Sequence, residues 1–343
     1  MSWRIALQVA ATYVGAVMGA GFASGQEIQQ FFARYGAYGL WGIIISAGLF
    51  ALMGWMMLDL QERWKIYSYS QFFRRLFGHR WGQRADILVS VLLFIGMLAM
   101  LSGAGALFEQ YFALPRWAGI FLTGVVIAAA LWQRGEGVLW INTVLIPLKF
   151  VFCLGIGVVA VLWAHPGESE GVAQLSNPIV NNWILAAVLY VSFNLTLAMV
   201  VFASLGKEVH KPGARMGALL GGLALGAFAL VIALALLRLP EVQGLEIPMV
   251  AVAGKLGKWA AFLYMVVLWL AMVTAAIGNG FSLVSRVVAV GYLGYAQSTL
   301  LLLALVMPMA GIKFSQLVQI GYPIFGYVGL IFLPTLVYNW LRR

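Results

Sequence analysis

Residues 14–32 (VGAVMGAGFASGQEIQQFF) combine closely spaced glycines with a carboxylate inside an apolar segment. Gly19 and Gly21 allow backbone conformations, and a close ligand approach, that a side chain would prevent. If the helix stops at these glycines and restarts, its second half begins with amide N–H groups that have no partner. That end of a helix carries about +0.5 elementary charge and suits an anion such as a carboxylate. The candidate donors are the backbone groups of Gly19, Ala20, Gly21, Phe22, Ala23 and Ser24.

Glu27 is the charged residue of this stretch, and three roles are open for it. The run from Ser24 to Glu27 matches a capping box, in which the glutamate reaches back to the serine amide and restarts the helix. A charge at the centre of a membrane helix costs about 2.5–3.5 kcal/mol on insertion scales, so Glu27 faces inward or is protonated. It then couples a proton or contacts a substrate amine. A salt bridge is the third role.

The composition is that of an integral membrane protein in a lipid bilayer. Of the 343 residues, 63% are hydrophobic and 9% are charged, and the mean hydropathy is +0.95. Soluble domains are about 45–50% apolar and about 25% charged. The net charge of +10 comes from lysines and arginines between apolar runs, which disfavours a basic face that binds nucleic acid. The single cysteine, Cys153, excludes an internal disulfide.

Ten apolar segments are each close to the roughly 20 residues that cross about 30 Å of hydrocarbon. They are 4–33, 38–60, 84–112, 116–132, 138–163, 181–205, 214–237, 257–288, 292–310 and 314–340. We expect the polar connection 61–83 to hold a short amphipathic helix and 239–256 not to cross the membrane. Most lysines and arginines fall on the side of the N-terminus. This predicts a multi-pass protein of the plasma membrane with both termini in the cytoplasm.

The sixth apolar segment carries a second polar interruption, SFNLT at residues 192–196. It lies about half a chain after the first, and each interruption opens a group of five segments. Freed backbone groups cannot face lipid, so paired interruptions in two halves indicate the binding site of an inverted-repeat transporter. We expect one transmembrane domain over residues 1–343, with repeats at about 1–164 and 181–341.

These motifs resemble those of known transporters. GAGF at 19–22 resembles the first-helix break of the amino acid–polyamine–organocation (APC) superfamily, and FNLTLAM at 193–199 resembles the sixth-helix break of LeuT-fold transporters. The run GAGFASGQE is similar to that of YkvI-type amino acid permeases. The resemblance implies an all-α fold of about ten transmembrane helices, a LeuT-like 5+5 inverted repeat with helices 1 and 6 unwound in mid-membrane. It makes Phe193 an aromatic lid beside Asn194, Thr196 and Met199; ordinary bundle packing is the alternative for these four residues.

The resemblance also implies a place for a coupling ion between the first break and helix eight. In sodium symporters of this fold, carbonyls and two adjacent hydroxyls bind the cation, and the matching positions here are Gly15, Met18, Ala271 and Thr274. Ala275 stands where the second hydroxyl belongs, whereas a hard cation needs a full oxygen shell. In some sodium-independent relatives a helix-five lysine replaces the cation and can exchange a proton, as Lys149 would here. Snorkelling towards the cytoplasm or pairing with Glu27 are its other roles.

Together these features predict a secondary active transporter of an amino acid or similar small zwitterion that works by alternating access. We expect proton coupling or independence from sodium, no other cofactor and no enzymatic activity. The alternatives are a sodium-coupled symporter and a carrier of a quaternary amine or other small organic solute. An intramembrane enzyme is disfavoured because Gly21-x-x-Ser24-Gly25 lacks the spacing of a nucleophile motif and the histidines fall in connections. A channel is also less favoured.

Overall fold

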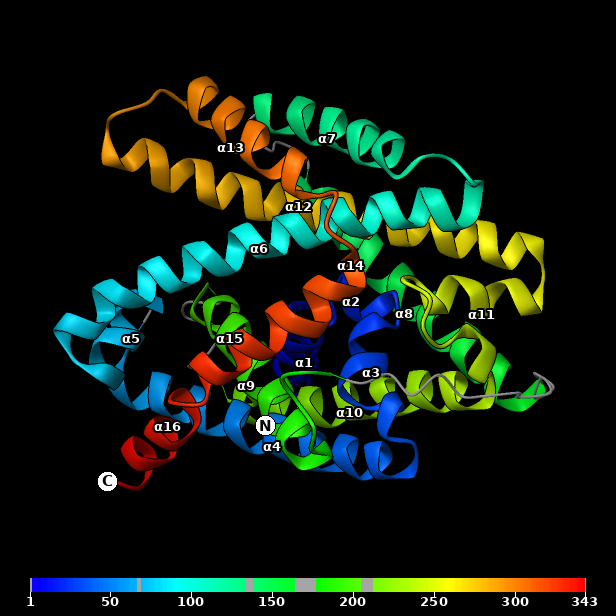
Figure 1. Ribbon diagram of the computed structural model, residues 1–343. Helices are drawn as coiled ribbons and strands as arrows, with labels where there is room; N and C mark the ends of the chain where they lie inside the picture. Colours follow the sequence, from blue (N-terminus) through cyan, green and yellow to red (C-terminus); the bar gives the residue numbers. More distant parts are fainter. Residues whose placement is uncertain (1, 67–68, 134–137, 164–176, 205–211, 343) are drawn as a thin grey trace.

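A computed structural model describes residues 2–66, 69–133, 138–163, 177–204 and 212–342, and these residues form helices and no strand (Figure 1). The elements that match the ten predicted spans are α1 (Trp3–Val17) with α2 (Ala20–Ala23) and α3 (Gln26–Phe31), α4 (Ala37–Trp64), α6 (His79–Phe112), α7 (Arg116–Trp132), α8 (Val138–Trp163), α9 (Trp183–Ser204), α10 (Ala214–Arg238), α12 (Lys258–Val290), α13 (Tyr295–Met309), and α14 (Phe314–Gln316) with the π-helical turn η4 (Leu317–Gly321), α15 (Tyr322–Gly329) and α16 (Phe332–Leu341). Five helical stretches are long and apolar enough to cross a membrane, and four shorter apolar helices accompany them in the described chain.

The predicted break in the first span is confirmed. α1 ends at Val17, the four-residue helix α2 follows, and α3 begins after Gly25. Gly25 has a φ of 83°, a left-handed conformation that glycine adopts without steric cost. A methyl group at this position would also lie 2.7 Å from Cγ of Met249. The break therefore consists of the end of α1, the short helix α2 and a tight turn at Gly25 that leads into α3.

The predicted break in the sixth span is wrong, because α9 is helical without interruption from Trp183 to Ser204. The polar side chains that suggested it bond to the carbonyls of their own helix. Asn194 Nδ2 donates to the Tyr190 carbonyl at 2.9 Å, and Thr196 Oγ1 donates to the Ser192 carbonyl at 2.9 Å. Each polar group is thus satisfied one turn back, and the segment contains no glycine or proline to stop the helix.

The helices form two groups that meet at the break (Figure 1). A bundle contains the first span (α1 to α3), α4, α9 and α10, which pack against one another. A scaffold contains α6, α7, α12 and α13, and lies across the upper half of the view in Figure 1. Each group takes two spans from each predicted half of the chain. α8 packs against both α10 and α12, and so connects the bundle to the scaffold.

Small residues set the distance between the helices of the bundle. A methyl group added at Gly222 of α10 would lie 2.3 Å from the backbone nitrogen of Ala51 in α4. A methyl group at Gly226, one turn later, would lie 2.3 Å from the Ala47 side chain. Membrane helices pack closely where small residues let their backbones approach, since lipid gives them little hydrophobic drive to associate. The long α4–α10 contact follows from this pattern.

The connection 61–83 contains a short helix, as predicted, and the connection 239–256, which was expected only not to cross the membrane, contains short helices as well. In the first, α5 (Tyr69–Phe77) buries Phe72 and Leu76 and exposes Arg74 and Arg75, which makes it amphipathic. The second contains the turn η3 (Pro240–Val242) and the helix α11 (Pro248–Leu256). Four of the basic residues behind the predicted orientation lie outside the described residues: Arg134, Lys207, Lys211 and Arg343. His165 and His210 lie there too.

We expect Gly222→Ala to lower the melting temperature of the detergent-purified protein, because overpacking a close contact costs about 1–3 kcal/mol. Gly48→Ala is the matched control, since Gly48 is a helical glycine of α4 around which a methyl group would meet nothing within 4 Å. Thermal unfolding followed by tryptophan fluorescence measures both variants. Equal melting temperatures for the two would contradict the close α4–α10 packing.

Candidate functional site

A cavity of about 130 Å³ lies beside the break of the first helix. It is mostly apolar and has a few polar groups on its walls. It is lined by the break and by four helices, α6, α9, α12 and α15. The wall includes Gly19, Ala20, Gly21, Glu27, Gly96, Met100, Phe193, Asn194, Asn279 and Tyr322. The cavity therefore sits where the bundle meets the scaffold, at the one place where a membrane helix of the bundle is interrupted among the described residues.

Lys149 of α8 reaches the break from the side. Its side chain is 7% exposed, and Nζ donates a hydrogen bond to the carbonyl of Met18. The lysine therefore does not snorkel to the cytoplasm, which was one of its expected roles. Within the described chain it forms no ion pair with Glu27 closer than 4.0 Å, although the two charges interact electrostatically. The ammonium thus provides a donor for the Met18 carbonyl, a backbone oxygen that the break leaves without a helical partner.

Two further donors hold the other end of the break. The hydroxyl of Tyr264 in α12 donates to the Ala23 carbonyl, and the amide of Met249 in α11 donates to the Ser24 carbonyl at 3.0 Å. The Ser24 hydroxyl itself donates to the Gly21 carbonyl at 2.7 Å. Backbone groups inside a membrane must face protein or a solvated cavity, because hydrocarbon supplies no partner. The break is therefore fixed by donors from α8, α11 and α12.

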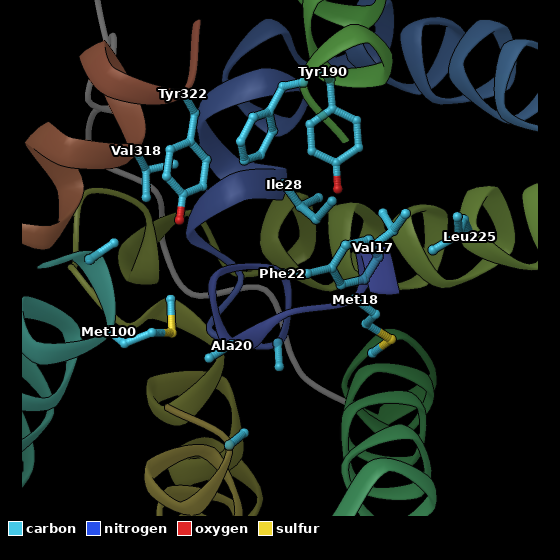
Figure 2. Close-up of a cluster of buried hydrophobic side chains, with 14 of the residues drawn as sticks. Val17, Met18, Ala20, Phe22, Ile28, Met100, Tyr190, Leu225, Val318 and Tyr322 are labelled. Atoms are coloured by element: carbon cyan, nitrogen blue, oxygen red, sulfur yellow. The ribbon is translucent and has the colours of Figure 1, made fainter. Parts of the chain in front are cut away.

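The amides at the start of α2 are the unpaired part of the break. The Gly19 amide donates to the Val17 carbonyl at 2.8 Å. In the described chain no protein acceptor is found for the amides of Ala20, Gly21 and Phe22. Ala20 and Gly21 line the cavity, so their N–H groups are donors for a group bound there. The Phe22 side chain is buried next to Val17 and Met18 instead (Figure 2).

Glu27 does not form the expected capping box. With Gly25 as the N-cap, Glu27 is the second residue of α3, and Ser24 Oγ accepts the Gln26 amide at 3.2 Å. Glu27 Oε2 accepts from the hydroxyl of Tyr190 at 3.4 Å, and Oε1 lies over Gly21, where an added methyl group would be 2.2 Å away. The carboxylate is thus part of the cavity wall and lies against the break.

The residues of α9 that were expected to bind substrate separate into two pairs. Phe193 and Asn194 line the cavity, and the Phe193 ring lies 4.6 Å from the ring of Tyr322, measured between centroids. Thr196 and Met199 are buried in the protein and do not line the cavity. Three residues of the first break also stay outside the wall: Phe22, Ala23 and Ser24.

The four positions matched to a sodium site do not present a free set of oxygens. The Met18 carbonyl already accepts from Lys149, and the Thr274 hydroxyl donates to the Ala271 carbonyl of its own helix at 3.2 Å. Gly15 lies in the last turn of α1. A cation at this place would have to displace the lysine ammonium from Met18.

Two polar residues of the cavity wall, Tyr322 and Asn279, were not predicted from the sequence. Tyr322 begins α15 and points its hydroxyl towards the break, as does Tyr190 from α9 (Figure 2). Asn279 of α12 lies against Gly96 of α6, where an added methyl group would be 2.7 Å from its Nδ2. A polar residue within the long apolar run of α12 was the signal that could have identified Asn279.

The two sides of the cavity differ. Wall residues such as Leu92, Leu197 and Asn279 lie in the halves of their helices on the side where α1 begins. On the other side α11 covers the break, and the loop before it is fixed to the scaffold and to α14. Gln110 exchanges two hydrogen bonds with the backbone of Ile247, while Glu246 pairs with Arg116 and accepts the Phe314 amide at 2.7 Å.

Comparison with known proteins finds relatives over almost the whole chain. It is 31% identical over 336 residues to the membrane protein YkvI of Bacillus subtilis (strain 168), covering 97% of this chain and 95% of YkvI. It is 28% identical over 339 residues to the protein YyaD of the same organism, covering 98% of this chain and 97% of YyaD. No family model matches the chain.

Solved structures of transporters share the fold. The inward-facing conformation of Mhp1 has a TM-score of 0.68 at 15% identity, covering 94% of this chain and 73% of Mhp1. A manganese transporter of Eremococcus coleocola has a TM-score of 0.53 at 16% identity, covering 97% and 85%. The LeuT-like fold implied by the sequence is thereby confirmed.

We expect Lys149→Met to loosen the break, because the buried Met18 carbonyl loses its donor at a cost of about 1–3 kcal/mol. Hydrogen exchange measured by mass spectrometry should be faster in peptides that cover residues 15–25. Lys258→Met, at the exposed start of α12, is the control and should leave these peptides unchanged. Unchanged exchange in Lys149→Met would show that the break does not depend on the ammonium.

Proposed function

This chain belongs to the YkvI family of membrane proteins, and we propose that it is a secondary transporter of an amino acid or similar small zwitterion. The observation that carries the proposal is the cavity at the break, with the free amides of Ala20 and Gly21 in its wall. Transporters that share the fold support the alternating-access part of it. The substrate class rests on the chemistry of the wall.

The wall offers opposite polarities to the two ends of a zwitterion. The amides of Ala20 and Gly21 are donors suited to a carboxylate. Asn194 and Asn279 carry side-chain amide oxygens, which accept from an ammonium group, and Phe193 covers the cavity from α9. A volume of about 130 Å³ is small beside the roughly 300–1,000 Å³ of drug-sized sites, which favours a small solute.

Lys149 supports coupling without sodium. Its ammonium lies on the Met18 carbonyl, which is one of the oxygens that a sodium ion would need. Thr274 offers a single hydroxyl that is bonded within its own helix. We therefore propose that the coupling ion is a proton, and that Lys149 replaces a bound cation in holding the break.

The difference between the two sides of the cavity supports alternating access. The side covered by α11 is closed through Glu246 and its partners, whereas the cavity extends towards the side where α1 begins. With the orientation given by the positive residues, the second side is the cytoplasm. In the proposed cycle, α11 leaves the break when the site opens to the outside.

A metal ion is less well supported as the substrate. Manganese prefers carboxylate, carbonyl and water oxygens. Glu27 is the only carboxylate among the described residues of the cavity wall, and the described chain has no group of three histidine, cysteine or acidic residues that could hold a metal. A quaternary amine is the better second candidate, because the rings of Phe193 and Tyr322 lie side by side in the wall and attract cations.

We expect a zwitterionic amino acid to raise the melting temperature of the purified protein equally in sodium and in potassium buffer. Ligand at 100 times its Kd stabilises the folded state by about 2.7 kcal/mol, which a thermal-shift screen of amino acids and quaternary amines detects. A shift that requires sodium would contradict the role of Lys149.

The variant Gly19→Leu tests, in the same thermal-shift screen, whether the ligand binds in the cavity. Gly19 lines the cavity, its φ of −70° is accessible to any residue, and an added methyl group would meet nothing within 4 Å. The variant should fold normally and lose the ligand-induced shift, because its side chain fills the cavity. A full shift in Gly19→Leu would place the binding site elsewhere.

A further inference from the structure

Three buried glutamines follow the break, and one amide atom of each has no partner in the described chain. Gln26 and Gln29 of α3 are fully buried and Gln30 is 6% exposed. Gln29 Nε2 donates to Gln26 Oε1 at 3.4 Å. Within the described chain no partner is found for Gln26 Nε2, Gln29 Oε1 or Gln30 Oε1. Buried polar groups are nearly always bonded to protein or ordered water, so these three atoms indicate internal water along α3.

Glu27 lies on the same helix, directly after Gln26 and ahead of Gln29 and Gln30. Glu27 and Gln30 are three residues apart, which places them on one face of α3. Glu27 lines the cavity, whereas α3 leads away from it towards η1 and the side that α11 covers. The line from Glu27 to Gln29 and Gln30 therefore runs from the cavity towards the closed side of the protein.

In the described chain, no neighbouring charged side chain forms an ion pair with the Glu27 carboxylate. Tyr190 of α9 donates to it, and Tyr322 of α15 and Lys149 of α8 interact with it electrostatically. Among the other elements packed on α3, η4 has no titratable side chain and α10 carries its charges at its ends. In η1, Arg34 and Tyr35 bond to the Val180 carbonyl.

The position of Glu27 ties its proton to the substrate. Oε1 lies against Gly21, whose amide is one of the two proposed for the substrate carboxylate. Two carboxylates at one place repel each other unless one of them is protonated. A protonated Glu27 instead donates a hydrogen bond to the incoming carboxylate. Substrate and proton therefore favour each other's binding, by reciprocal linkage.

We propose that Glu27 carries the coupled proton and that water held by Gln26, Gln29 and Gln30 delivers it from the outer side. This proposal rests on the proposed function, because it assumes a substrate carboxylate at the break. The proton moves from outer water to Glu27, the substrate binds, and both leave to the inner side. Nothing is oxidised or reduced, and each cycle returns Glu27 to its carboxylate form.

Proton uptake on substrate binding tests the first part. Purified protein in weakly buffered solution, at a series of pH values from neutral to alkaline, is mixed with the amino acid found in the thermal-shift screen, and a pH indicator follows the solution. The unmodified protein should take up a proton as substrate binds. Glu27→Gln, which keeps a neutral hydrogen-bonding side chain, should bind the substrate and take up none. Binding without uptake at every pH of the series in the unmodified protein, or uptake that persists in Glu27→Gln, would overturn the proposal.

The glutamines are tested by the rate at which a proton gradient drives uptake into proteoliposomes. Gln29→Leu should slow proton-driven uptake while substrate binding and its proton uptake in detergent stay unchanged. Gln61→Leu is the matched control, because Gln61 of α4 is also fully buried with its amide unpartnered in the described chain. Equal slowing by both variants, or none in Gln29→Leu, would overturn the route. If no amino acid binds the unmodified protein, the proposed function fails first, which is a distinguishable result.

Discussion

The interrupted backbone of the first helix is the constraint on which the rest of the structure depends. Lipid offers no hydrogen-bond partner for freed backbone groups, so these groups must face protein or a solvated cavity. Lys149, Tyr264 and the Met249 amide give donors to three carbonyls of the break. These donors come from three different elements, α8, α12 and α11. The need to satisfy the break therefore determines which elements pack against it.

The same constraint explains why the cavity has a polar and an apolar part. The carbonyls of the break are held by protein donors, whereas the amides of Ala20 and Gly21 remain free at the wall. Glu27 lies over Gly21 and takes its hydrogen bond from Tyr190 on another helix of the bundle. The break thus links the bundle, the scaffold and α8, and a movement between these groups changes the environment of one site.

Local signals in the sequence predicted the membrane class, the positions of the spans and the first break, where Gly25 adopts a left-handed conformation that favours glycine. The break in α9 was predicted wrongly: Asn194 and Thr196 are polar but bond to their own helix, which a polar run alone does not show. Glu27 matched a local capping pattern, yet its partner Tyr190 is 163 residues away. Tyr322 and Asn279 reach the cavity only through tertiary packing, so their place could not be read from the sequence.

An experimental structure with a bound amino acid in sodium-free buffer tests the central claim most directly. We predict that the carboxylate of the amino acid lies at the amides of Ala20 and Gly21 while the Lys149 ammonium stays on the Met18 carbonyl. An amino acid bound away from the break would contradict this account. So would a structure with sodium present in which a cation sits on the Met18 carbonyl and Lys149 is turned away.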